Sequence, residues 1–181
     1  MQPIKFTVLG QAKPAGSKTA FPLRHKDGSP ILRANGSQAI AVTHATSGTR
    51  PWMDVVATTA RREYAGPLIE CEVGVVLWFY KVRPASHYGT GRNAGVLKDG
   101  APQYVAGWYD VDKLARAVND CLSGTVIRDD KQIVVLVAQK LYGEPGRVEV
   151  LVARPESPEV AEAKQLVLWE QKRKKATVTI T

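Results

Sequence analysis

Asp110 and Asp112 are two carboxylates separated by a single residue, and two further acids, Asp129 and Asp130, follow after a short apolar stretch. Two carboxylates at this spacing, joined by a third that returns from a later turn, can converge on a divalent cation. Carboxylates held this close repel one another unless a cation or a proton lies between them. In an otherwise basic chain, this acidic group predicts a metal-dependent enzyme that acts on a polyanion.

The chemistry expected of such a group is phosphodiester hydrolysis. Mg²⁺, with Mn²⁺ as a substitute, prefers carboxylate, water and phosphate oxygens, and it can polarise a phosphodiester and help to generate hydroxide. Asp110, Asp112 and Asp130 are the predicted metal ligands. Arg116 lies one turn after Asp112, where a guanidinium can contact phosphate, and Lys113 is a further candidate for the same contact.

An amphipathic helix over residues 110–122 is expected to position these groups. Asp112, Arg116 and Asp120 are spaced by four and occupy one side of this helix, so the opposite side is left for the core. The apolar positions of that opposite side, which follow helical periodicity, are Leu114, Ala117, Val118, Cys121 and Leu122. Each acid also has a structural alternative, because Asp112 can cap the helix and Asp129-Asp130 can form a turn before the next strand.

The remaining pattern predicts an α+β fold. Apolar periodicity and turn residues give the expected strands 4–9 and 69–80, a short hairpin of 31–32 with 39–42 around Asn35-Gly36, and the expected helices 51–64, 110–122 and 157–175. The β-branched run 132–142 is followed by Gly143-Glu-Pro145-Gly146 and by valines at alternate positions. This order predicts that 132–142 and the strand after it form a hairpin.

Composition allows one main domain in these 181 residues, of which 44% are hydrophobic and 23% are charged. The formal net charge of +8 favours anionic partners, among which nucleic acid is the commonest. Cys71 and Cys121 lie in apolar segments and form no metal-binding pair, so we expect reduced core thiols. No signal peptide or membrane span is evident, and the sequence therefore predicts a cytosolic protein.

The acidic region resembles the RusA-type Holliday junction resolvases of phages and prophages. The matching residues run from Asp110-Val-Asp112-Lys-Leu-Ala-Arg116 through Asp120-Cys-Leu122 to Asp129-Asp130-Lys-Gln132-Ile133. The early basic segment from Gly10 to Lys18 is similar to the segment that follows the first strand of that family. The order and spacing of the parts make the resemblance far more specific than any single part.

This resemblance implies a homodimeric, Mg²⁺-dependent endonuclease that cuts branched DNA during recombination and repair, in the cytoplasm of a bacterial host if a phage encodes it. It implies a small mixed sheet with two core helices, a nuclease domain over residues 1–155 and a C-terminal helical extension over 156–181. Asp110, Asp112 and Asp130 would hold the metal, and Arg116 stands where the family has its functional lysine. The implied DNA contacts are Lys13, Lys18, Lys113 and Arg116.

Three alternatives remain open on the sequence. One is a structure-specific nuclease that prefers flaps or forks. Another is a non-catalytic DNA-binding protein whose acids only cap and turn the chain, and the last is a dimeric structural protein. A dependence of function on Mg²⁺ separates the nucleases from the other two, whereas salt-dependent DNA binding does not.

Overall fold

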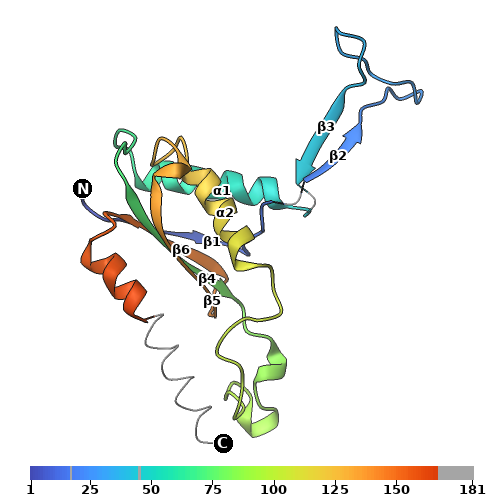
Figure 1. The fold of residues 1–181 in the computed structure, drawn as a ribbon. Helices are drawn as coiled ribbons and strands as arrows, with labels where there is room; N and C mark the ends of the chain where they lie inside the picture. Colours follow the sequence, from blue (N-terminus) through green and yellow to red (C-terminus); the bar gives the residue numbers. More distant parts are fainter. Residues whose placement is uncertain (17, 45, 167–181) are drawn as a thin grey trace, which may run out of the picture.

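The computed structural model describes residues 1–16, 18–44 and 46–166. Its centre is a four-stranded sheet in the order β1-β6-β4-β5, drawn in Figure 1. The strands are β1 (Ile4–Leu9), β4 (Val73–Lys81), β5 (Ile133–Tyr142) and β6 (Arg147–Ala153). β5 runs parallel to β4, whereas β6 is antiparallel to both of its neighbours. The sheet is therefore mixed, and the prediction of an α+β fold is confirmed.

Two helices, α1 (Thr49–Glu63) and α2 (Val111–Leu122), cover one face of this sheet. The apolar stripe predicted for α2 is buried, and Ala115 is buried beside it. α1 begins two residues before the predicted start, because Gly48 takes a left-handed conformation (φ 78°) at the N-cap position. Pro51 therefore lies within the first turn, where its missing N–H removes no helical hydrogen bond.

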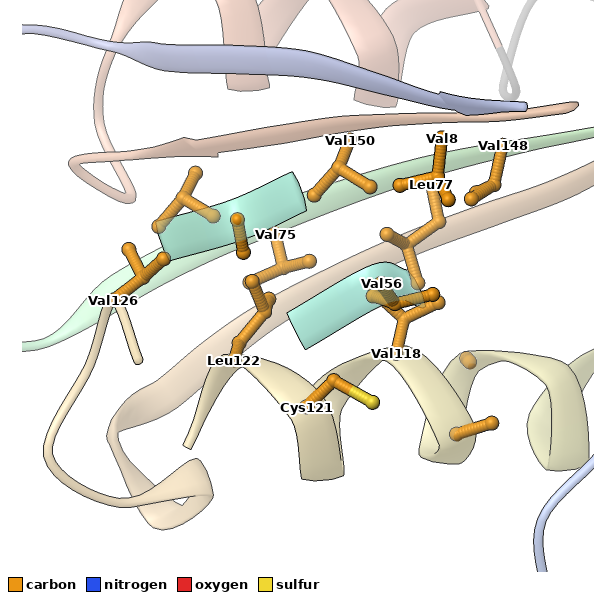
Figure 2. Packing of buried hydrophobic residues seen from close by; sticks show 14 of the residues in the cluster. Val8, Val56, Val75, Leu77, Val118, Cys121, Leu122, Val126, Val148 and Val150 are labelled. Atoms are coloured by element: carbon orange, nitrogen blue, oxygen red, sulfur yellow. The ribbon is translucent and has the colours of Figure 1, made fainter. Parts of the chain in front are cut away.

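The core lies between this helical layer and β4, the strand that is buried on both faces. Figure 2 shows Val75 and Leu77 of β4 against Val118 and Leu122 of α2. β4 reads as a continuous apolar run because the second face of the sheet is covered as well. A helical segment at residues 158–166 supplies that cover.

The connection from β5 to β6 corrects one prediction. β5 and β6 do not form a hairpin, because β4 lies between them and pairs with both. The connecting residues 143–146 pass over the end of β4, where the Gly143 N–H donates to the Lys81 carbonyl at 3.1 Å. A Cβ at Gly143 would lie 2.6 Å from Tyr80 Cδ1, so this crossing requires glycine. A short link can span two strand spacings, about 10 Å, as readily as one.

The long segment before α1 also differs from its prediction. β2 (Lys18–Pro22) pairs with β3 (Ile40–His44), and this two-stranded sheet projects away from the main sheet in Figure 1. The predicted turn at Asn35-Gly36 is present, with the Gly36 N–H donating to the Arg33 carbonyl at 2.9 Å. The strand partner of 40–44 was missed because Lys18–Pro22 lies in a stretch rich in Gly, Pro and Ser.

The other connections contain short 3₁₀ turns, η1 (Ala85–His87), η2 (Gly91–Asn93) and η3 (Asp130–Gln132). The helical segment at 158–166 packs Val160 and Ala163 against the second face of the sheet. This confirms the start of the predicted C-terminal helix, while its predicted continuation to residue 175 lies outside the described residues. Within the described ranges, no helix has the length and apolarity needed to cross a membrane.

Candidate functional site

Asp110 occupies the N-cap position of α2, yet its side chain makes no capping hydrogen bond. Its carboxylate instead accepts the ammonium of Lys113, with 2.7 Å between Lys113 Nζ and Asp110 Oδ2. This side chain is 63% exposed. The Lys113 ammonium holds the pKa of Asp110 below its ordinary value, first through the hydrogen bond and then through its charge. Asp110 is therefore an ionised carboxylate available at the surface.

Asp112 lies in the first turn of α2 and is also exposed. Its negative charge helps to raise the pKa of Lys113, after the larger effects of the Asp110 hydrogen bond and charge. The Lys113 ammonium thus lies in the field of both carboxylates. Free N–H groups at a helix N-terminus add to the positive potential there. The two acids form a pair whose present counterion is a flexible side chain.

The segment before β2 packs against this end of α2. The Ala15 N–H donates to the Lys113 carbonyl at 2.9 Å, and Ala12, Pro14 and Ala15 are buried. Gly16 adopts φ 129° and lies against Arg116, so that a Cβ there would approach Arg116 Nη1 to 3.2 Å. The basic segment that the sequence analysis singled out therefore lies directly beside the acidic pair.

This packing gathers three of the predicted DNA-contacting residues. Arg116 is exposed next to Gly16, and Lys113 lies between the acids. Lys13 reaches over the ring of Tyr109, with its Nζ 6.0 Å from the ring centroid. Lys18 is exposed farther along, at the start of β2.

A cavity of about 240 Å³ opens at the same place. It is lined by Pro14, Ala15, Thr46, Trp108, Tyr109, Asp110 and Lys113. The indole N–H of Trp108 is buried without a hydrogen-bond partner among the described residues. A larger cavity of about 330 Å³ lies on the opposite face of the sheet, between β1, β6 and the helix at 158–166, and none of the predicted site residues lines it.

Lys140 is a residue of this site that the sequence analysis missed. It is the one cation of β5, and its Nζ donates to the Tyr109 carbonyl at 2.9 Å. Its charge also lowers the pKa of Asp110, as the smallest of the contributions. A lysine inside a strand of valine, leucine and alanine was the available signal, because cations are rare in such strands without a partner.

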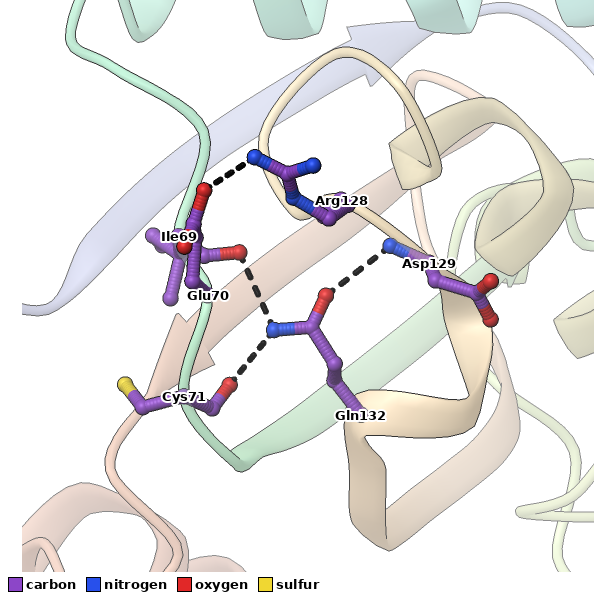
Figure 3. Close-up of polar contacts among 6 residues, drawn as sticks. All are labelled: Ile69, Glu70, Cys71, Arg128, Asp129 and Gln132. Carbon is purple, nitrogen blue, oxygen red and sulfur yellow. Dashed lines mark hydrogen bonds and ion pairs between the residues drawn. The ribbon is translucent and has the colours of Figure 1, made fainter.

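Asp129 and Gln132 form a closed structural unit at the beginning of β5, shown in Figure 3. The Asp129 side chain accepts the Lys131 N–H at 3.0 Å, and Gln132 Oε1 accepts the Asp129 N–H at 2.9 Å, completing a capping box around η3. The Gln132 amide also donates to the carbonyls of Ile69 and Cys71, at 3.0 and 2.8 Å. The pKa of Asp129 is lowered, and the largest cause is the hydrogen bond that its carboxylate accepts from the Lys131 backbone N–H.

Asp130 begins η3 and is exposed, but it lies at the opposite end of α2 from Asp110. Lys140 is hydrogen-bonded to Tyr109 and therefore lies near Asp110, whereas Asp130 lies just before Ile133, at the other end of β5. The strand from Ile133 to Lys140 is about 23 Å long. Among the described residues, no three Asp, Glu, His or Cys side chains converge as a metal site. Within one chain, the structure brings Asp110 and Asp112 together and leaves Asp130 apart.

Comparison with known proteins agrees with the acidic pattern. The family model described as "Endodeoxyribonuclease RusA" matches residues 27–153, which is more than half of the chain. The matched region includes Asp110, Asp112, Arg116 and Asp130 and ends with the last strand of the sheet. No curated protein matches the chain.

Proposed function

Because the chain belongs to the RusA endodeoxyribonuclease family, we propose that it is a Mg²⁺-dependent nuclease that resolves four-way DNA junctions, acting as a homodimer. The observation that carries this proposal is the N-terminal end of α2, where Asp110 and Asp112 are both exposed and where Asp110, paired with Lys113, lines a cavity. Residues 1–155 would form the nuclease domain, and 156–181 would be a helical extension.

The donor set at this end of α2 fits a divalent ion. Mg²⁺ is commonly held by one or two carboxylates together with water and phosphate oxygens, and Asp110 and Asp112 supply such a pair. Both are exposed, and the cation now beside them is an ammonium on a flexible side chain, which can move aside. Asp110 and Asp112 would hold the metal, and Mn²⁺ would substitute; Asp130, which lies at the other end of α2, would join them only across the proposed homodimer. When bound, the ion supplies polarisation of the phosphodiester and a more acidic water.

The cations around the acids have distinct roles in this proposal. Lys113 neutralises the carboxylates in the free protein and becomes available to a DNA phosphate when another cation takes its place. Arg116 contacts the DNA backbone with its guanidinium, whose planar donors suit phosphate oxygens. Lys140 holds Tyr109 and thereby the start of α2, so that it positions Asp110.

DNA binding by the rest of the chain follows from charge. Lys13 lies over the ring of Tyr109, and Lys18 begins the projecting hairpin, which also exposes Arg24, Lys26 and Arg33. Such phosphate contacts position the duplex without reading its sequence. They make the affinity fall steeply with salt.

The proposal is tested by cleavage of a labelled four-way junction and of a linear duplex of the same sequence, with Mg²⁺ or with EDTA. We expect cuts in the junction alone, only with the metal, and lost in Asp110→Asn while junction binding persists. Asp54→Asn is the matched control, since Asp54 is an exposed acid on α1. Equal or faster cleavage of flaps and forks would favour the other nuclease class, and binding without cleavage under any metal would leave a DNA-binding protein.

A further inference from the structure

The cavity of about 240 Å³ beside Asp110 has aromatic walls, because Trp108 and Tyr109 both line it. The centroids of the two rings are 6.1 Å apart, and the ring planes are inclined by 35°. Pro14, from the segment that follows β1, and Thr46, from the segment that precedes α1, line the cavity as well. Three segments that are distant in the sequence therefore build this cavity.

The fold holds both aromatic residues in place before any ligand binds. The Trp108 N–H donates to the Ala106 carbonyl at 3.0 Å, and the Tyr109 carbonyl accepts from Lys140 Nζ at 2.9 Å. Both side chains are partly buried and pack against the hydrophobic core. A wall that is already ordered loses little conformational entropy when a ligand binds to it.

Packing against the core does not by itself explain why residue 108 is tryptophan. A buried indole N–H usually has a hydrogen-bond partner, whereas that of Trp108 has none among the described residues. A phenylalanine would supply an aromatic ring without an unsatisfied polar group. Trp52 has an equally unpaired N–H, but of the two only Trp108 lines this cavity.

Each of the two rings also has a lysine near its face. The Nζ of Lys81 lies 6.0 Å from the ring centroid of Trp108. The Nζ of Lys13 lies at the same distance from the ring centroid of Tyr109, and Lys113 lines the cavity itself. Proteins bind unpaired nucleotides with this combination, because aromatic rings stack on bases while cations attract the phosphates. The lining therefore suits a nucleotide whose base has left the duplex.

The volume limits the size of the ligand. Pockets for drug-sized ligands have about 300–1,000 Å³, so a cavity of about 240 Å³ admits a smaller group, such as one nucleobase. Branched DNA can supply such a base where its strands cross, since a base that is already unpaired costs the least to extrude. Asp110 lines the cavity and belongs to the proposed metal site, so a base in the cavity would place its own phosphate near the acids.

We propose that this cavity holds one unpaired nucleobase of branched DNA, stacked on Trp108 and Tyr109 and adjacent to the phosphate that is cut. The inference rests on the proposed function for the identity of the DNA, whereas binding of the base does not require cleavage. A linear duplex supplies a base to the cavity only after unpairing and unstacking it. Trp108 and Tyr109 are therefore specificity-determining residues that favour branched over linear DNA.

A cycle that combines protein variants with a change in the DNA tests this site. Four-way junctions are prepared in which the base of one nucleotide is removed, at each position flanking the crossover in turn. Dissociation constants are measured by fluorescence anisotropy in EDTA for wild type, Trp108→Leu and Tyr109→Leu. At one position, the ratio of the constants for abasic and intact junction is expected to be about tenfold larger for wild type, because only wild type loses a stacked base.

Two further measurements accompany the cycle. Both variants are expected to bind the intact junction about tenfold more weakly than wild type and the linear duplex equally well. Trp78→Leu is the matched control, since Trp78 lines the larger cavity on the opposite face of the sheet, and it should keep the wild-type ratio. Circular dichroism shows whether each variant is folded, and Tyr109→Leu decides the test if Trp108→Leu is not.

Two results would overturn the base site. One is a ratio of dissociation constants that is the same for wild type and for the folded variants at every position. The other is an equally large change of that ratio in Trp78→Leu, which would show that loss of any partly buried tryptophan has this effect.

The outcome for the base site is separable from the outcome for the proposed function. If Mg²⁺ supports junction cleavage and no position shows the expected difference, the base site fails and the proposed function stands. If one position shows the difference and no metal supports cleavage, the nuclease proposal fails, and the base site remains as part of a DNA-binding protein.

Discussion

The two ends of α2 each present an aspartate at the start of a helical turn, and the structure uses them differently. Asp110 precedes α2 and makes no capping bond, so its carboxylate faces solvent with a lysine as counterion. Asp129 precedes η3, and its carboxylate accepts a hydrogen bond from the Lys131 N–H inside a capping box. The residue type and the local position are the same, but only the first carboxylate is left free for a ligand.

The comparison shows what distinguishes a reactive acid from a structural one in this molecule. At the Asp129 end, backbone groups satisfy the side chains of Asp129 and Gln132, and Figure 3 shows the hydrogen bonds of Gln132. At the Asp110 end, the partner of the carboxylate is the ammonium of a lysine side chain, Lys113. Substitutions at the Asp129 end should therefore alter the stability of the fold, and substitutions at the Asp110 end should alter the rate of DNA cleavage.

The largest expected effect is that of Asp110→Ala on junction cleavage. We expect a loss of about 10²-fold or more, because one of the two carboxylates that would stabilise the metal and the developing charge is gone. The urea midpoint should change little, since no capping bond is lost. Single-turnover cleavage and urea unfolding on one preparation check both parts, and full activity in Asp110→Ala would erase the distinction between the two ends.

Gln132→Ala should show the reverse pattern. It removes two part-buried hydrogen bonds to backbone carbonyls and one from the Asp129 N–H, and we expect a loss of about 2–3 kcal/mol in the free energy of unfolding. Urea denaturation measures it. The matched control is Gln139→Ala on the strand that follows, β5, which should cost much less. A Gln132→Ala protein as stable as wild type would show that the network at the Asp129 end is not needed for stability.

Gly16→Ala asks whether the Asp110 end also depends on packing. The φ of 129° and the approach of Arg116 oppose a side chain there, so we expect a loss of about 1–3 kcal/mol in stability, together with weaker junction binding. Gly28→Ala is the control, because a Cβ at Gly28 meets nothing within 4 Å although its φ is also positive. Binding weakened equally by both changes would count against a specific role of the Gly16–Arg116 contact.

The smallest expected effect is on the stability of the fold at low pH. The folded-state pKa of Asp129 lies below its ordinary value of 3.8, so its contribution is present above that pH and is lost as the pH falls through the lower folded-state value. Asp129→Ala should therefore melt lower than wild type at pH 7, and the difference should disappear toward pH 2. Thermal melts at both pH values in high salt check this, because salt screens ion pairs such as Lys113–Asp110 more than the capping bond.

Local sequence patterns were sufficient to predict the elements whose structure depends mainly on neighbouring residues. The stripe from Leu114 to Leu122 placed α2 correctly, because helical periodicity alone determines which side is buried. The turn at Asn35-Gly36 was also found, because glycine readily supplies the positive φ that this turn requires. The failed hairpin after β5 shows the limit, since Gly143-Glu-Pro145-Gly146 suits a tight link whether or not β4 lies between the strands.

The separation of Asp130 from Asp110 within one chain was not foreseen for a related reason. Asp110 precedes α2 and Asp130 precedes β5, and the chain reverses between them, so the full length of the helix, about 18 Å, separates the two. Sequence proximity of Asp130 to the end of α2 concealed its distance from the beginning. The packing of residues 12–16 against α2 was likewise not predicted from the sequence, because it depends on where β1 leaves the sheet.

The place of β1 in the sheet also sets an order of events during synthesis. β1 is paired in the sheet only with β6, which ends at Ala153, although β1 begins at Ile4. The first strand to leave the ribosome therefore waits for the last strand before it has a partner, and ordering such distant contacts is slow. Residues 12–16 follow β1, so their packing beside Asp110 forms only when residues 1–153 have nearly all emerged. A nascent or truncated chain that stops before β6 should be unable to form this packing and to cut DNA.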